Sequence, residues 1–447
     1  MNPATPAEPA PAPPKPAPAS YRRIASLALP ALVVLAAEPI YLLIDTAVVG
    51  HLGAVPLGGL ALGGVIMGLA PLVGAVLAYG TTARASRRYG AGDRAGAVAE
   101  GVQGTWLALA AGLFMIVAIE IFAGPLAGLM GDDPAVEAAA AEWLRVAILG
   151  APFLLVAGAG QGWMRAVQDT KRPMWFVSVS FLLSAVLAPV LVYPAGLGLV
   201  GSAWANAVAQ AISGVLFLLA LRRERVSLAL DWPLMSKQLV ANGDLIVRGI
   251  AFQVSSFSAA AVAARVGTAA LGAHQIGMQL WFFAALALDA VAIAAQALIG
   301  ADLGAGRPDT ARASAKRITV VGVGYGVVFL VLIFALLPVL PDLFTKDASV
   351  HEQLGYIWPW LVLLLPVAGV VFALDGVLIG AGDLRFMRNM TVISIASGLP
   401  FTWLTLVFGW GLTGIWGGIA VYMLVRLGLI LWRLRSGAWA VTGAERA

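Results

Sequence analysis

IASLALPALVVLAAEPIYLLIDTAVV, residues 24–49, decides which kind of fold this chain can adopt. The run is mostly apolar and carries no charge apart from Glu38 and Asp45, and it exceeds the ~20 residues that a helix needs to cross a bilayer. Further apolar segments follow at about 58–80, 98–119, 139–164, 174–193, 200–221, 241–263, 271–299, 318–340, 354–380, 389–408 and 413–432. The sequence therefore predicts an all-α polytopic membrane protein with twelve transmembrane helices.

The composition agrees with a membrane protein and argues against enzymes. Hydrophobic residues make up 60% of the chain and charged residues 11%, against ~25% charged residues in soluble proteins. Cysteine is absent, which excludes disulfides and thiol chemistry. The histidines, His51, His274 and His351, are far apart, which argues against a zinc hydrolase site. We expect no enzymatic activity, no metal and no cofactor beyond a coupling ion.

Lysine and arginine residues set the predicted orientation. All 28 fall in the tails or in loops on one side, except for Arg145, Arg248, Arg265, Lys346 and Arg426. The positive-inside rule then puts both termini in the cytoplasm, for a multi-pass protein of the inner (plasma) membrane. The net charge of +5 reflects this bias, so we expect the lipid bilayer rather than nucleic acid as a partner.

The two halves of the chain repeat each other. At an offset of 214 residues, the triplet 90–92 matches 304–306 (both Gly-Ala-Gly), and other matches include Gly53 with Gly267, Pro152 with Pro366 and Asp169 with Asp383. Six spans return the chain to its starting side, so the halves are parallel repeats, a design that suits alternating access. We expect a disordered Pro/Ala-rich tail (1–20), a six-helix bundle (21–221), a cytoplasmic linker (222–240), a second six-helix bundle (241–435) and a C-terminal tail (436–447).

The acids of the first span are the main candidates for function. A charged group at mid-bilayer costs at least ~2.5–3.5 kcal/mol, and Glu38 and Asp45, seven residues apart, share one helix face. Pro39 between them removes a backbone hydrogen bond to Leu35 and predicts a hinge. We interpret Asp45 as an ion-responsive carboxylate that a wet cavity could load and release. The alternatives for Asp45 are a hydrogen bond between helices or a place at the outer interface.

Two later acids, Asp289 and Asp375, are either functional or interhelical locks. Arg248 lies about two turns into the seventh span, and we expect it to reach the cytoplasmic face or to pair with an acid there. Because the clearest intramembrane charges are acidic, small organic compounds of cationic or amphipathic character are the expected substrates.

Three segments resemble the multidrug and toxic compound extrusion (MATE) transporters, and within them the DNA-damage-inducible protein F (DinF) branch: EPIYLLIDTAVVGHLG (38–53), GQGWMRAVQDTKRP (160–173) and LGAHQIGMQLWFFAALALDAVAIAAQALIG (271–300). The resemblance implies two six-helix bundles and H⁺- or Na⁺-driven antiport of organic, often cationic, compounds. Asp45 matches the first-span coupling acid of the family.

The resemblance also extends to the C-terminal bundle and to the fifth span. Asp289 and Asp375 match acids of this branch and of a sister branch, and Gln253 stands where the sister branch has a glutamate. The branch usually carries an asparagine and, four residues on, an aspartate in the fifth span, where this chain has Ser184 and Ala188. We hypothesise that Glu38 supplies the missing acid.

We expect the transporter to be a monomer, and two other classes of function remain as alternatives. A flippase for lipid-linked saccharides would share the superfold, but such proteins usually have a more basic central cavity and extra spans. An intramembrane enzyme would need a catalytic dyad in a defined motif, which scattered histidines and a long internal repeat do not suggest.

Overall fold

The structure, a computed structural model, describes residues 17–445. Most of the expected disordered tail (1–20) and the last two residues of the C-terminal tail therefore lie outside the described residues. The first helix begins where Ser20 accepts a hydrogen bond from the backbone N–H of Arg23, a typical N-cap. Within residues 17–445, twelve segments are long and apolar enough to span a membrane, which confirms the predicted number.

The first half of the chain forms one lobe of six spans. Its helices are α1 (Tyr21–Gly50), α2 (Ala54–Met67), α3 (Leu69–Gly90), α4 (Arg94–Met130), α5 (Pro134–Ala147), α6 (Ala151–Ala166), α7 (Lys171–Val192) and α8 (Gly198–Arg223). Two spans are interrupted: α2 and α3 meet at Gly68, and a 3₁₀ turn, η1 (Ile148–Gly150), separates α5 from α6. The hydropathy pattern did not reveal these breaks, because the residues around them are equally apolar.

The second half forms the other lobe, with α9 (Trp232–Val266), α10 (Thr268–Gly304), α11 (Pro308–Leu336), the short α12 (Leu340–Phe344), α13 (Ala348–Gly380), α14 (Leu384–Phe408) and α15 (Gly411–Arg435). The helices on both sides extend into the expected linker 222–240. The α9 helix starts early because the Asp231 side chain caps it by accepting from the Leu234 N–H. Only residues 224–231 connect the lobes.

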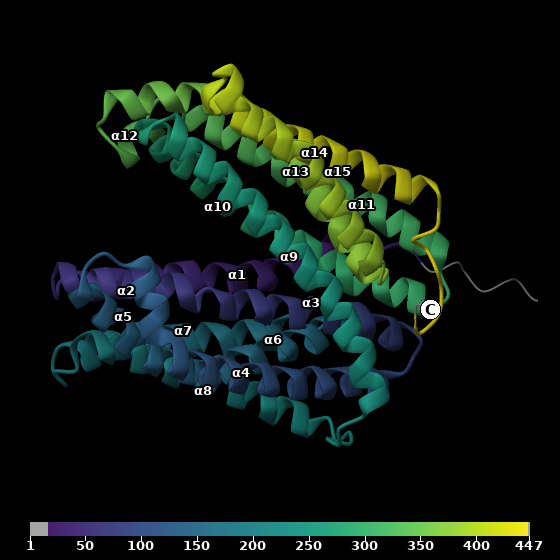
Figure 1. The fold of residues 1–447 in the computed structure, drawn as a ribbon. Helices are drawn as coiled ribbons and strands as arrows, with labels where there is room; N and C mark the ends of the chain where they lie inside the picture. The colour runs from purple at the N-terminus through teal and green to yellow at the C-terminus, as the bar shows by residue number, and fades with distance from the viewer. Residues whose placement is uncertain (1–16, 446–447) are drawn as a thin grey trace, which may run out of the picture.

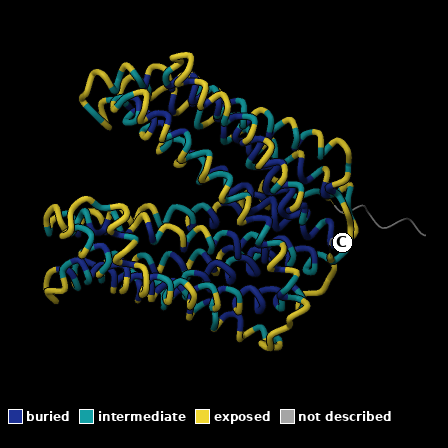
Figure 2. The backbone as a smooth tube through the Cα atoms, in the orientation of Figure 1, coloured by how far each residue is buried: buried dark blue, intermediate teal, exposed yellow. Residues whose placement is uncertain are grey.

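The lobes meet at one end of the molecule and diverge at the other (Figure 1). We call the end near the described chain termini the junction end, and the end with α2, α5 and α12 the far end. Helices α1 and α3 contact α10, and α3 also contacts α9. Buried residues gather inside each lobe and at the junction end, as Figure 2 shows. Each lobe therefore has its own core, and the lobes share packing only where they meet.

The repeat is visible in the contact that closes the junction end. A Cβ atom added to Gly90 of α3 would lie 2.0 Å from the Ala301 carbonyl oxygen, and one added to Gly304 of α10 would lie 1.9 Å from the Arg87 carbonyl oxygen. The offset of 214 carries residue 87 onto 301 and residue 90 onto 304. The same close backbone approach is thus made twice, with the roles of the two lobes exchanged.

The C-terminal segment, residues 436–445, crosses the junction. The Val441 carbonyl accepts a hydrogen bond of 2.8 Å from the Arg87 guanidinium, and the Glu445 carboxylate pairs with Arg88 at 2.5 Å. Both arginines belong to α3, whereas the segment follows α15. It therefore ties the end of the second lobe to the first lobe.

Candidate functional site

Asp45 is buried inside the first lobe, with 1% of its surface exposed. Its Oδ2 atom accepts a hydrogen bond of 3.2 Å from the Ser202 hydroxyl of α8, and that hydroxyl in turn accepts from the Trp143 indole of α5 at 3.1 Å. In the described part of the chain, the Asp45 Oδ1 atom has no hydrogen-bond partner. One oxygen of Asp45 thus makes the interhelical hydrogen bond of the alternative interpretation, and the other is buried without a partner among residues 17–445.

Tyr41 extends this site by one helical turn. Its ring packs against Phe181 of α7 with centroids 5.6 Å apart, and its hydroxyl lies beside Ser184 and Asn206. The predicted Ser184 is therefore near Asp45, although it is not bonded to it. Sequence reasoning missed Tyr41 and Ser202. Tyr41 could have been found, because it lies four residues before Asp45 and so on the same helix face.

Glu38 occupies the same face of α1 as Tyr41 and Asp45, as the spacing predicted. Its side chain is half-buried, and it makes no hydrogen bond or ion pair among residues 17–445. Next to it, Pro39 is exposed, and α1 remains helical from Tyr21 to Gly50 through this proline. The predicted hinge at Pro39 is thus not a break in this conformation, and hinge motion remains a prediction.

Ala188 lies at the level of Asp45. Two contacts show that helices α1 and α7 run parallel. Tyr41 of α1 packs against Phe181 of α7, and further along both helices the Tyr193 hydroxyl donates to the Val48 carbonyl at 2.6 Å. One turn beyond Ser184 on α7 therefore corresponds to one turn beyond Tyr41 on α1. Ala188 is fully buried there, and its methyl group offers no polar partner.

Asp375 of α13 is an interhelical lock in the second lobe. Its Oδ2 atom accepts hydrogen bonds from Arg248 of α9, at 2.6 Å, and from Arg426 of α15. The ring of Phe252 lies 5.2 Å from the Arg248 guanidinium and 4.9 Å from that of Arg426. Arg426 also donates to the Tyr422 hydroxyl at 2.6 Å. Arg248 thus pairs with an acid, as expected, and the pair is largely buried inside the lobe.

Asp289 of α10 connects the two lobes. It accepts a hydrogen bond of 2.6 Å from the Tyr79 hydroxyl of α3, and it lies within electrostatic range of Arg165 and Arg248. Arg165, from the 160–173 motif, also donates to Gln161 at 2.5 Å. Asp289 is therefore partnered across the lobe boundary and belongs to a network near the junction end.

Gln253 does not join that network. It is exposed and makes no hydrogen bond to Asp375, although it follows Phe252 directly. Since neighbouring residues of a helix point ~100° apart, the face of α9 that carries Arg248 and Phe252 is turned away from Gln253.

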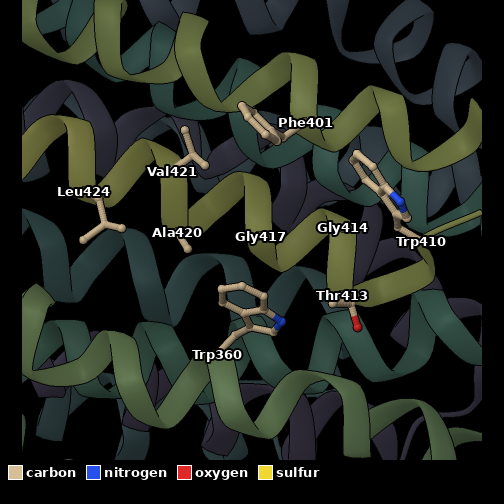
Figure 3. Close-up of a pocket in the computed structure, with 9 residues that line it drawn as sticks. All are labelled: Trp360, Phe401, Trp410, Thr413, Gly414, Gly417, Ala420, Val421 and Leu424. Carbon is tan, nitrogen blue, oxygen red and sulfur yellow. The ribbon is translucent and has the colours of Figure 1, made fainter. Parts of the chain in front are cut away.

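A cavity of about 710 Å³ lies elsewhere in the second lobe, between α13, α14 and α15 (Figure 3). Its walls are almost entirely apolar, and it holds none of the predicted site residues. The lining residues are Trp360, Phe401, Trp410, Thr413, Gly414, Gly417, Ala420, Val421 and Leu424.

These features describe a multi-pass membrane protein of two repeated helical lobes with buried charges between them, the architecture of a transporter. A family model described as MatE matches residues 30–190 and again residues 245–404. The chain therefore belongs to the MatE family of membrane transporters. The double match has the spacing of the internal repeat.

Individual relatives agree with this assignment. Protein DETOXIFICATION 44, chloroplastic, of Arabidopsis thaliana is 31% identical over 93% of this chain and 83% of its own length. DNA damage-inducible protein F of Escherichia coli (strain K12) is 30% identical over 92% of both chains. A solved structure described as the outward-facing conformation of a multidrug resistance MATE family transporter has a TM-score of 0.84 at 21% identity, covering 94% of this chain and 96% of that one. The MATE resemblance, its DinF branch and the fold are thereby confirmed.

Proposed function

We propose that this transporter is a secondary active exporter of small organic compounds, that it works as an H⁺ or Na⁺ antiporter by alternating access, and that Asp45 is its coupling carboxylate. The observation that carries the proposal is the unpartnered Oδ1 atom of this buried acid. Similar proteins that are described as multidrug resistance proteins support the export of foreign compounds.

The surroundings of Asp45 suit either ion. A proton would neutralise the carboxylate while the Ser202 hydrogen bond holds it in place. A sodium ion would need several oxygen ligands, and the hydroxyls of Tyr41 and Ser184 and the Asn206 side chain lie one turn away. Because every bond of this cluster joins elements of the first lobe, ion release would reorganise that lobe and change how it packs against the other.

The lobe arrangement supports the export cycle. Parallel repeats that pivot about a shared contact expose a site between them to alternate sides. If both termini are cytoplasmic in an inner (plasma) membrane, as we propose, the junction end faces the cytoplasm and the lobes diverge outward. A monomer contains both lobes and suffices for this cycle.

Glu38 is the proposed second acid of the first lobe. It shares the Asp45 face, and in the described residues it has no partner that would hold it in another role. Ala188, which fills the level of Asp45, leaves that acid without the usual neighbour.

The expectation of cationic substrates now rests on fewer residues. Asp289 and Asp375 are bound to tyrosine and arginine, so only Asp45 and Glu38 still favour a cation. One observation favours the flippase alternative: Arg165, Arg248 and Arg426 outnumber Asp289 and Asp375 in the network where the lobes meet. The twelve spans still count against it.

The test is transport into everted membrane vesicles, with imposed ΔpH and ΔNa⁺ varied separately and a lipophilic fluorescent cation as the reporter. We expect one of the two gradients to drive uptake and Asp45→Asn to abolish it. Glu142→Gln, which neutralises an exposed acid on α5, is the matched control and should transport normally. Full coupled transport by Asp45→Asn would refute the coupling role, and wild-type behaviour of Glu38→Gln would refute the compensation hypothesis.

A further inference from the structure

The network near the junction end carries an unbalanced charge. It contains three arginines, Arg165, Arg248 and Arg426, and two aspartates, Asp289 and Asp375. Three positive and two negative groups leave one positive charge in excess, and all five residues belong to membrane-spanning helices. Buried charges in such helices are normally paired or used, so the excess calls for an anion.

The two arginines of the second lobe keep donors free. Both converge on the Oδ2 atom of Asp375, and within residues 17–445 the Nε atoms of Arg248 and Arg426 and the Oδ1 atom of Asp375 have no hydrogen-bond partner. A guanidinium carries five N–H donors in a planar fork that matches the two oxygens of a carboxylate. Asp375 therefore positions the pair without using up its donors.

The same arginines rest on an aromatic surface. Phe252 lies against both guanidinium groups, which fixes their planes through cation–π attraction. The arrangement is built from α9, α13 and α15, and it is held in place before any ligand arrives. Such preorganisation lowers the ordering cost of binding.

Arg248 is the accessible member of the group. Its side chain keeps 13% of its surface exposed, against 3% for Arg426. It lies within electrostatic range of both Tyr79 and Asp289, whose hydrogen bond joins the lobes. A ligand at Arg248 would thus sit where the lobes meet, in position to sense their movement.

We propose that Arg248 and Arg426, with Phe252 beneath them, bind the carboxylate of an amphipathic organic anion or zwitterion that the protein exports. This assignment rests on the proposed exporter function and deepens it, because it replaces the expected purely cationic substrate by one with a negative group. Arg248 forms the charge-assisted contact, and Phe252 packs against the apolar part of the ligand.

The test compares two fluorophores of the same xanthene scaffold, the anion carboxyfluorescein and the cation rhodamine 123. Binding to the purified full-length protein is measured by fluorescence polarisation, and transport is measured in everted vesicles. We expect Arg248→Gln to weaken carboxyfluorescein binding at least tenfold without weakening rhodamine binding. Arg248→Lys keeps the charge, and its affinity for carboxyfluorescein should lie between those of the wild type and Arg248→Gln.

The matched control is Arg388→Gln of α14, which breaks another arginine–aspartate pair, with Asp244 of α9 at 2.6 Å, outside the network. It should bind carboxyfluorescein as wild type does. Asp289→Asn tests the opposite direction, because it raises the excess positive charge, and we expect severalfold tighter carboxyfluorescein binding. Circular dichroism melting checks that each variant is folded.

The outcomes separate this inference from the exporter function. If rhodamine is transported but carboxyfluorescein is not bound, the anion site is refuted and the exporter function stands. If neither dye moves under any gradient, the exporter function itself fails. Wild-type carboxyfluorescein affinity in folded Arg248→Gln, or unchanged or weaker affinity in Asp289→Asn, overturns the anion site.

Discussion

Adding one methyl group at Gly304 should open the junction end. Its Cβ atom would lie 1.9 Å from the Arg87 carbonyl oxygen, whereas real Cβ contacts are essentially never below 3.0 Å. The atom in the way belongs to the backbone of Arg87, so no side chain can turn aside to make room. Helices α3 and α10 must therefore separate locally by at least about 1.1 Å, the difference between 3.0 and 1.9 Å. Overpacking of this kind costs about 1–3 kcal/mol.

That cost falls on one conformation only. An arrangement in which the lobes have parted at the junction end does not contain the clash, so Gly304→Ala should shift the ratio of the two arrangements by about 5- to 150-fold. Gly90→Ala should act alike, because its Cβ atom would lie 2.0 Å from the Ala301 carbonyl oxygen in the repeat-related contact. Gly324→Ala in α11, whose Cβ atom would meet nothing within 4 Å, is the control.

The assay uses the absence of cysteine in the chain. Cysteines introduced at the exposed positions Ala95 and Asp309, one in each lobe near the junction end, take spin labels without any background. Double electron–electron resonance then gives the distribution of distances between the lobes. We expect a longer-distance population that grows in Gly304→Ala and stays at wild-type level in Gly324→Ala. Identical distributions in the two variants would refute the idea that close backbone packing holds this end shut.

Three further predictions concern stability and the C-terminal segment. Trp163→Ala removes a fully buried indole, and the cost of about 3–5 kcal/mol should lower the melting temperature of the purified protein clearly. Glu100→Gln should destabilise by up to about 3–5 kcal/mol, because the buried carboxylate accepts from Arg84 at 2.8 Å; an unchanged melting curve would contradict this. The hydrogen bond from Lys237 holds the pKa of Glu445 below its ordinary value of 4.5. The stability that this contact contributes is therefore fully present above pH 4.5, and it is lost as the pH falls through the lowered pKa. A spin label on residues 436–445 should become mobile as the pH falls through this lowered pKa, and equal mobility at neutral and strongly acidic pH would argue against a role of the Glu445 carboxylate in holding the segment.

The number of spans and the repeat could be predicted because both are properties of the chain in one dimension. Apolar length fixes a transmembrane helix without any knowledge of its neighbours, and a constant offset needs no structure. The shared face of Glu38 and Asp45 is equally local, since it depends only on helix geometry. These predictions used no contact between distant parts of the chain.

The partners of the buried acids could not be predicted, because they come from distant segments. Asp375 binds Arg426, 51 residues away, and Arg248, 127 residues away. Asp45 binds Ser202, 157 residues away. A list of charges therefore suggested an acidic interior, whereas the groups that meet between the lobes, with Arg165 from the first lobe, carry one positive charge in excess. The sign of a buried site depends on which groups meet, and that is a property of helix packing.

The C-terminal segment has a practical consequence for anyone who works with this protein. A fluorescent protein or affinity tag fused after residue 447 would hang from a segment that is bonded to α3 through Val441 and Glu445. A tag at this position would lie next to a contact between the lobes, so rates measured on the fusion need comparison with those of the untagged chain.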